Sequence, residues 1–324
     1  MICIRSTSDD PCFNLAAEEY LLKKTSLDFF LLYRNRPSVI VGKHQNTLAE
    51  INLDFIRGQN IKVVRRISGG GTVYHDEGNV NYSFIRNGEK GKLVDFKRHT
   101  RPIINFLSTL GLQVQDDGRN SLTIDGKKIS GNAEHVYQDR VLHHGTLLFS
   151  SALNNLEEAL KTQQSGYQDK AIRSIPSTVT NLADCLAETI TIESFTSRLF
   201  SFVMGSFEDS SEYEFTTGDL EEIDRLIKEK YDCREWNYGY SPRYSHEKEL
   251  LLLGKPVTLM IDVDNGLIAS LNIVGESVAD GLQEKLRQAL TGKPHSPDII
   301  YESLKGFIPD VGETDLQNII AGFF

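Results

Sequence analysis

The spacing of apolar residues predicts helices and strands in alternation through the first part of the chain. Asp10-Pro11 is a suitable start for a helix, and apolar positions at helical spacing continue to about Lys24. Two short runs rich in aromatic and β-branched residues, 29–33 and 38–41, then predict strands. Apolar residues at helical spacing ahead of Gly111 predict a second long helix.

The same patterns continue to the C-terminus. Residues 120–124 and 127–130 flank Asp125-Gly126, a pair that favours a type I′ turn, so they predict a hairpin. A strand is expected at 141–149, a long polar loop at 163–178, and helices at 154–162, 181–187, 191–204 and 220–230. The last 80 residues or so predict strands at 250–253, 256–261 and 266–274 and helices at 278–290, 297–304 and 313–321.

Length and composition turn these elements into a domain prediction. The chain has 324 residues, of which 40% are hydrophobic and 25% charged, as in an ordinary globular protein. That length is large for a single core, and the composition changes near residues 246–249. We therefore expect an α+β protein with a large domain at 1–245 and a small α/β domain at 246–324.

Charge and cysteine content exclude several classes of function. Thirty-five basic and 45 acidic residues give a net charge of −10, so no nucleic-acid partner is expected. Neither a signal peptide nor an apolar run of about 20 residues is evident, so no membrane association is expected. The four cysteines are widely spaced without a CxxC pair, which indicates reduced thiols in the cytoplasm.

The most distinctive stretch, residues 63–84, reads VVRRISGGGTVYHDEGNVNYSF. In its strand-like start, neighbouring Arg65 and Arg66 must point to opposite faces. Gly69-Gly70-Gly71 would let a ligand approach main-chain N–H groups. No Gly-Lys-Ser/Thr follows, and a strand rather than a helix comes next, so neither a P-loop nor a dinucleotide fingerprint is present. The stretch predicts a cradle for phosphate or carboxylate.

A second stretch, residues 125–149, reads DGKKISGNAEHVYQDRVLHHGTLLF. With RRxSGGGxVxHDxGNxNxSF before it and KxSGxA within it, the chain resembles the lipoate–protein ligases of the two-domain bacterial type. These enzymes belong to the biotinyl/lipoyl protein ligase superfamily. The resemblance implies a large domain with a mixed β-sheet flanked by helices, followed by a small accessory domain.

The resemblance also implies an activity. Lipoate would attack the α-phosphate of ATP to give lipoyl-AMP, and a lysine of an acceptor protein would then take the lipoyl group and release AMP. The implied acceptors are lipoyl domains of 2-oxo-acid dehydrogenases and glycine-cleavage H-type proteins. Mg²⁺ would accompany ATP, held mainly by phosphates.

Site residues carried over from the family fall in three groups. Lys128 is the implied catalytic residue, and Asp76 is the nearest candidate metal ligand. Implied contacts to ATP and lipoyl-adenylate are Arg66, Ser68, Gly69, Gly70, Gly71, Thr72, Val73, Tyr74, His75, Asn79, Lys128, Ser130 and Gly131. The implied lipoate pocket comprises Tyr33, Val39, Gly42, Gln45, His143 and Gly145.

Strand alternation adds two expectations about which side chains lie on the same face of a strand. After the Asp125-Gly126 turn it places Lys128 and Ser130 on one face and Lys127 and Ile129 on the other, so only one lysine can face a site. It also separates the adjacent histidines of the HHGT strand, which argues against both binding one metal ion.

Two alternatives remain open at this point. An octanoyl or lipoyl transferase of the same superfamily would use a cysteine thioester, but residues 165–178 contain no cysteine. The other alternative is a nonenzymatic protein that binds lipoyl domains.

The segment from Ile175 to Asn181 lacks both arginines of the family's V-R-S-R-V-T-N pattern, and Arg173 is the nearest substitute. A basic segment at 86–101 is a candidate docking surface for acidic acceptors.

Overall fold

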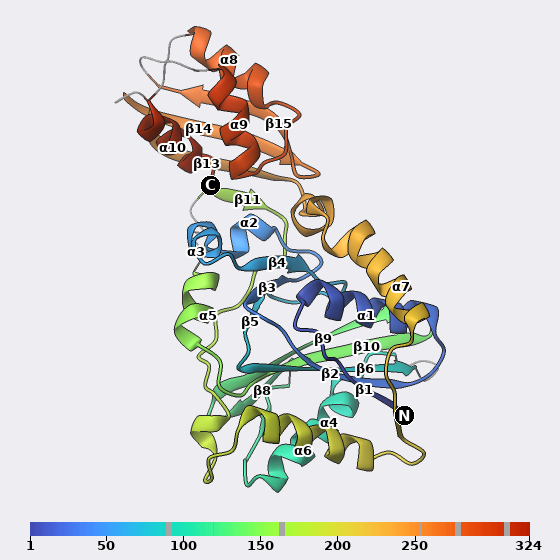
Figure 1. Cartoon of the computed structure of the whole chain (residues 1–324). Coiled ribbons are helices and arrows are strands. Elements are labelled where there is room, and N and C mark those ends of the chain that lie inside the picture. Colours follow the sequence, from blue (N-terminus) through green and yellow to red (C-terminus); the bar gives the residue numbers. More distant parts are fainter. Residues whose placement is uncertain (89–92, 119, 162–165, 253–254, 276–279, 308–311) are drawn as a thin grey trace. The chain divides into compact units, whose positions relative to one another are not determined.

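A computed structural model of the chain describes residues 1–324 except 89–92, 119, 162–165, 253–254, 276–279 and 308–311 (Figure 1). The described chain forms two compact units. The large unit comprises residues 1–43, 55–160 and 174–233, and the small unit comprises 44–54, 161–173 and 234–324. The expected boundary after residue 245 lies inside strand β13 (Tyr244–Leu252). The small unit therefore begins earlier and also includes two segments, 44–54 and 161–173, from earlier in the chain.

The large unit is built on a mixed eight-stranded sheet of order β12-β1-β2-β6-β10-β9-β8-β7. Its strands are β1 (Ile2–Arg5), β2 (Phe29–Arg34), β6 (Asn79–Asn87), β7 (Gln115–Asp116), β8 (Ser121–Ile124), β9 (Lys127–Tyr137), β10 (Arg140–Leu148) and β12 (Ser211–Glu212). Strand β1 is parallel to β2 and β12, whereas β2, β6, β10, β9 and β8 pair antiparallel. The expected α+β class with a mixed sheet is confirmed.

Helices cover both faces of this sheet. Figure 1 shows α1 (Pro11–Lys24) on one side and α4 (Phe96–Thr109) with α6 (Ile192–Gly205) on the other. As predicted, Asp10 caps α1, since its carboxylate accepts from the Cys12 amide at 2.8 Å. The core between the sheet and α4 and α6 is apolar and aromatic; its largest buried side chains include Phe30, Tyr82, Phe84, Phe106, Phe195 and Phe200.

A three-stranded sheet carries the glycine-rich stretch. Strand β3 (Ser38–Val41) lies between β4 (Lys62–Arg65), to which it is parallel, and β5 (Val73–His75), to which it is antiparallel. Residues 66–72 therefore pass from one edge strand to the other. Helix α5 (Leu153–Leu160) packs near β5, and the short α3 (Leu53–Gly58) precedes β4.

The small unit has a four-stranded antiparallel sheet of order β11-β13-β14-β15. Strands β14 (Lys255–Asp264) and β15 (Leu267–Val274) follow β13, while the edge strand β11 (Tyr167–Asp169) comes from the segment expected to be a loop. Its helices are α2 (Thr47–Glu50), α8 (Asp280–Leu290), α9 (Pro297–Phe307) and α10 (Glu313–Ala321). Apolar side chains from the strands and from α8, α9 and α10 form its core, as expected for the predicted α/β unit.

Other elements differ modestly from expectation. The helix predicted at 181–187 is one 3₁₀ turn, Ala183–Cys185. Helix α7 (Thr217–Leu226) continues into a wider turn at Ile227–Tyr231, and a separate wide turn follows at Glu235–Gly239. Residues 89–92 of the basic segment and 162–165 of the long loop lie outside the described residues. Within the described chain, no helix combines the length and apolar character needed to cross a bilayer.

Candidate active site

Arg66 organises the glycine loop from inside. Its Nη2 donates to the carbonyls of Gly69 and Gly71 at 2.6 and 2.8 Å, and its Nη1 donates to the carbonyl of Ile40 at 3.1 Å. Its Nε donates to the Ser68 hydroxyl at 2.9 Å. Burial lowers the pKa of Arg66 to about 10, which keeps it charged at neutral pH. The guanidinium therefore fixes the loop with most of its donors.

These contacts decide where the loop's amides point. Because a trans peptide holds C=O and N–H on opposite sides, a carbonyl turned toward Arg66 turns the next N–H away from it. The carbonyl of Gly71 is held in this way, and the following Thr72 amide donates to the Ser174 hydroxyl at 2.8 Å. Gly70 adopts a φ of +86°, which favours glycine. The loop thus directs N–H groups outward, as an anion site requires.

Ser68 connects this loop to a buried network on the α1 face of the large sheet. Its hydroxyl lies 2.6 Å from His144 Nε2, and His144 Nδ1 lies 2.9 Å from the Glu18 carboxylate. Glu18 also accepts hydrogen bonds from Tyr33, at 3.0 Å, and from Ser83. Sequence reasoning missed both Glu18 and His144. A carboxylate four residues after Asn14 in a largely apolar helix was the available signal.

His75 and Asn79 border the same network. Burial, with the charge of Arg66, lowers the pKa of His75 to about 3, so its ring is neutral at physiological pH. Asn79 Nδ2 donates to Asn81 Oδ1 at 2.8 Å. Within the described chain, Asn79 Oδ1 and Asn81 Nδ2 are buried without a hydrogen-bond partner. Such orphaned groups are typical of a site that receives a polar ligand.

Lys128 lies directly before a β-bulge. Leu122 pairs with Ser130 and Thr123 pairs with Lys128, so Ile129 is an extra residue in β9. Ile129 and Ser130 consequently both lie toward the core, and the expectation that Lys128 and Ser130 share a face is wrong. Burial and the charge of Arg66 lower the pKa of Lys128, while Asp117 raises it. Lys127 is exposed, as expected for the lysine outside the site.

Gly131 and Gly145 make room for side chains on opposite faces. A Cβ at Gly131 would lie 3.2 Å from both Cε and Nζ of Lys128, so this glycine lets the lysine cross β9. A Cβ at Gly145 would instead overlap Asn132, whose Oδ1 accepts from the Tyr82 hydroxyl at 2.5 Å. Gly145 therefore accommodates a contact on the core side.

His143 also lies on the core side, away from Ser68. Its Nδ1 is 2.9 Å from Glu134, which is 3.1 Å from His99 Nδ1 and accepts from the Asp95 amide at 3.1 Å. His99, Glu134 and His143 are the group of potential metal ligands found among the described residues. The carboxylate already receives all three hydrogen bonds. The structure places His144, and not the expected His143, beside the glycine loop.

Several other candidates for the lipoate pocket belong to other elements of the chain. Val39 pairs with Tyr74, so their side chains lie on the same face of the three-stranded sheet, and His75 points to the other face. Tyr74 lies beside Asn155 of α5. Gln45 belongs to the small unit, where it is fully buried. Val73, next to the loop, is half-buried. Gly42 contributes its carbonyl, which accepts from Arg65 Nη1 at 3.0 Å.

Asp76, the candidate metal ligand, does not fit that role. Its Oδ1 accepts from the Gly78 amide at 3.0 Å, and its Oδ2 accepts from the Ala152 amide at 2.7 Å. The side chain is 5% exposed. Both oxygens therefore hold the turn before β6 and the segment leading into α5, and no metal ligand is assigned to this residue.

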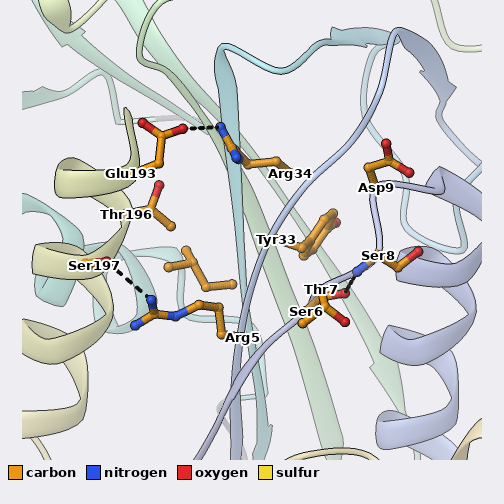
Figure 2. Close-up of a pocket in the computed structure, with 11 residues that line it drawn as sticks. Arg5, Ser6, Thr7, Ser8, Asp9, Tyr33, Arg34, Glu193, Thr196 and Ser197 are labelled. Carbon is orange, nitrogen blue, oxygen red and sulfur yellow. Dashed lines mark hydrogen bonds and ion pairs between the residues drawn. The ribbon is translucent and has the colours of Figure 1, made fainter. Parts of the chain in front are cut away.

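A cavity of about 250 Å³ lies where the parallel strands β1 and β2 end (Figure 2). Two arginines border it: Arg5 donates to Ser197 at 3.2 Å, and Arg34 lies 3.5 Å from Glu193. Tyr33 also lines it, although its hydroxyl points to Glu18. Of the residues predicted for the lipoate pocket, Tyr33 alone is among those that line this cavity.

Residues 10–203 match the family described as the lipoyl protein ligase A/B catalytic domain, and residues 241–321 match the bacterial lipoate protein ligase C-terminus. A lipoate-protein ligase of Bacillus subtilis, LplJ, is 37% identical over 302 residues, which cover 92% of this chain and 91% of that protein.

Two solved structures share the fold. A lipoate-protein ligase A bound with ATP has a TM-score of 0.62 at 24% identity and covers 74% of this chain and 98% of its own. A bipartite lipoate protein ligase from Thermoplasma acidophilum, described with its E2 lipoyl domain, has a TM-score of 0.61 at 24% identity. It covers 74% of this chain and 96% of its own.

Proposed function

The chain belongs to the lipoyl protein ligase A/B family, and we propose that it activates lipoate with ATP and transfers the lipoyl group to a lysine of an acceptor protein. It is an ATP-dependent, AMP-forming ligase. The observation that carries this function is the arrangement of Arg66 and the glycine loop, with its carbonyls held inward, its Thr72 amide outward, and Lys128 within the electrostatic reach of Arg66.

In the first half-reaction, the lipoate carboxylate attacks the α-phosphorus of ATP and pyrophosphate leaves. Negative charge grows on the phosphate oxygens, where the outward Gly70 amide would bind them, while the Thr72 amide is held by Ser174. Lys128 would place its ammonium between the carboxylate and the phosphate. Because the loop is fixed before substrate arrives, these donors need little reorganisation.

In the second half-reaction, the ε-amine of the acceptor lysine attacks the acyl carbonyl of lipoyl-AMP. The new C–N bond forms as the C–O bond to AMP breaks, and the amine gives up one proton to solvent. Lys128 would stabilise the oxyanion that develops on the carbonyl and the phosphate that departs. Buried neutral His75 and the asparagine pair Asn79 and Asn81 supply uncharged polar groups beside this region.

Mg²⁺ is the proposed metal of the first half-reaction. Bound with ATP, it would neutralise charge on the phosphates. Since both oxygens of Asp76 are engaged by backbone amides, we assign no protein ligand and expect phosphates and water to hold the ion.

The proposed acceptors are lipoyl domains of 2-oxo-acid dehydrogenases and glycine-cleavage H-type proteins. One solved relative was described with an E2 lipoyl domain, which supports the first class. The cytoplasm is the proposed compartment, and all four cysteines being free thiols supports a reducing environment.

Mass spectrometry tests the function directly. The purified chain is mixed with ATP, Mg²⁺, lipoate and a panel of apo acceptors, and each acceptor is weighed. A lipoyl mass increase that requires ATP supports the ligase. Modification from an acyl-thioester donor without ATP would indicate a transferase, and acceptor binding without modification would indicate a nonenzymatic binder.

A further inference from the structure

A continuous line of hydrogen bonds connects α1 to the glycine loop. It runs from Glu18 to His144 (2.9 Å), to Ser68 (2.6 Å), to Arg66 (2.9 Å), and on to the carbonyls of Gly69 and Gly71. The Glu18, His144 and Ser68 side chains are almost entirely buried. The residues come from α1, β10 and the segment that follows β4.

The two ends of this line fix the direction of two of its bonds, and the proton position on His144 fixes the third. Arg66 Nε can only donate, so the Ser68 hydroxyl accepts from it. Glu18 receives hydroxyl donors from Tyr33 and Ser83 on one oxygen, and its second oxygen accepts from His144 Nδ1. If His144 carries its proton on Nδ1 alone, its Nε2 has a lone pair. The Ser68 hydroxyl donates its proton to that lone pair.

We infer that Glu18 and His144 are positioning residues that set the nucleotide affinity of the glycine loop through Ser68 and Arg66. Glu18 holds His144 in the Nδ1–H tautomer, which turns the Ser68 proton away from Arg66 and leaves its lone pair for the guanidinium. Arg66 then keeps the loop carbonyls inward and the amides outward. This inference rests on the proposed function only in taking ATP as the ligand of the loop.

Glu18→Gln is the most informative variant, because glutamine keeps the shape of the glutamate side chain but replaces one acceptor oxygen with an NH₂ donor. The carboxylate meets three donors, from Tyr33, Ser83 and His144, whereas a side-chain amide offers one oxygen and an NH₂ group. When that NH₂ faces His144, the ring must carry its proton on Nε2 and donate to Ser68. Ser68 then accepts from two donors while its own proton loses its acceptor, so its oxygen becomes a weaker acceptor for Arg66.

The chain supplies a matched control in Glu134→Gln. Glu134 holds the neighbouring histidine, His143, at the same 2.9 Å distance but on the opposite face of the sheet. The substitution makes the same chemical change to a nearly buried carboxylate that also binds a histidine Nδ1. It leaves the loop and its contacts untouched.

The test measures ATP dissociation constants by calorimetry and histidine tautomers by ¹⁵N NMR of the imidazole nitrogens, with His144→Gln used to assign the signal. We expect His144 in the wild-type protein to carry its proton on Nδ1 and in Glu18→Gln on Nε2. The Kd for ATP should rise about tenfold in Glu18→Gln, comparable with the loss of one hydrogen bond. In Glu134→Gln it should stay within about twofold.

Three results would overturn the inference: an Nε2–H tautomer in the wild-type protein, unchanged ATP affinity in Glu18→Gln, or equal losses in both variants. If Glu18→Gln does not fold, Ser68→Ala replaces it and should weaken ATP binding by a similar factor. Because the NMR measurement needs no turnover, it tests the tautomer of His144 independently of the proposed ligase function. A wild-type chain with the expected tautomer but no ATP binding would contradict the proposed function instead.

Discussion

His143 and His144 are consecutive residues of β10, yet each lies 2.9 Å from a different buried carboxylate, Glu134 and Glu18 respectively. Strand alternation sends the two rings to opposite faces of the large sheet. One face carries the glycine loop and its hydrogen-bond network, and the other carries the aromatic core beneath α4. The sheet therefore separates the candidate chemistry from the main packing.

Buried neutral histidines should make the fold sensitive to acid. Burial lowers the pKa to about 3 for His75 and His295 and to about 4 for His143. An unfolded chain binds protons at these residues below pH 6.5 or so, while the folded chain does not. The free energy of unfolding should therefore keep its full value above that pH and fall progressively toward pH 4. Each histidine lowers it by at most about 1.4 kcal/mol per pH unit.

Urea denaturation at pH 7.5, 6.0 and 5.0 measures this dependence. His75→Gln should flatten the curve relative to wild type, because it removes one group that must stay deprotonated. A denaturation midpoint that does not change between pH 7.5 and 5.0 would show that these histidines take up protons equally in the folded and unfolded states.

Gly145→Ala should destabilise the large unit. The new methyl group would overlap Asn132 and lie 2.6 Å from the Tyr82 hydroxyl, at the point where these two side chains hydrogen bond. Overpacking of this kind typically costs ~1–3 kcal/mol in the free energy of unfolding. Gly58→Ala is the control, since no atom lies within 4 Å of its added Cβ. Equal unfolding free energies for the two variants would contradict the packing described here.

Reversing exposed charges on α4 should weaken acceptor transfer. Lys97 and Arg101 are both exposed there, whereas Arg98 is half-buried. Lys97→Glu with Arg101→Glu should slow transfer to an acidic acceptor, leave pyrophosphate release unchanged, and matter less at high salt because exposed charges are screened. Lys24→Glu, an exposed charge reversal on α1, is the control. Equal transfer rates for all three proteins at low salt would exclude this docking surface.

Cys185→Ser should leave lipoylation nearly unchanged. Cys185 is half-buried in a single 3₁₀ turn and packs against the core of the large unit. Its role there is that of a small apolar side chain. The lipoylation rate of the variant is measured beside wild type, and denatured reaction mixtures are searched for an acyl-enzyme. A trapped thioester on Cys185 would move the chain to the transferase class.

Local patterns predicted the hairpin that carries Lys128 but not its register. Asp125 and Gly126 have φ values of +50° and +75°, as the expected type I′ turn requires. Simple alternation then failed at Ile129, three residues after Gly126, because this residue forms a bulge that only the pairing with β8 reveals. The lysine reached the expected side, whereas Ser130 did not.

Contacts between residues far apart in the chain could not be predicted from the sequence, for a different reason. Glu18 sits in a helix that was correctly predicted, but a glutamate is normally exposed, and only the packing of α1 over β10 gives it His144 as a partner. Likewise, residues 44–54 and 161–173 join the small unit through contacts with distant segments. No local change in composition marks such a connection.

The central claim is that Lys128, beside the glycine loop, serves both half-reactions. Lys128→Ala should reduce pyrophosphate release and transfer from synthetic lipoyl-adenylate by about 10²–10³ each, the usual effect of losing one preorganised electrostatic donor. Lys127→Ala, which alters the exposed neighbour, should stay within a few-fold of wild type in both assays. A Lys128→Ala enzyme that retains either rate, or a severe loss in Lys127→Ala, would contradict the site described here.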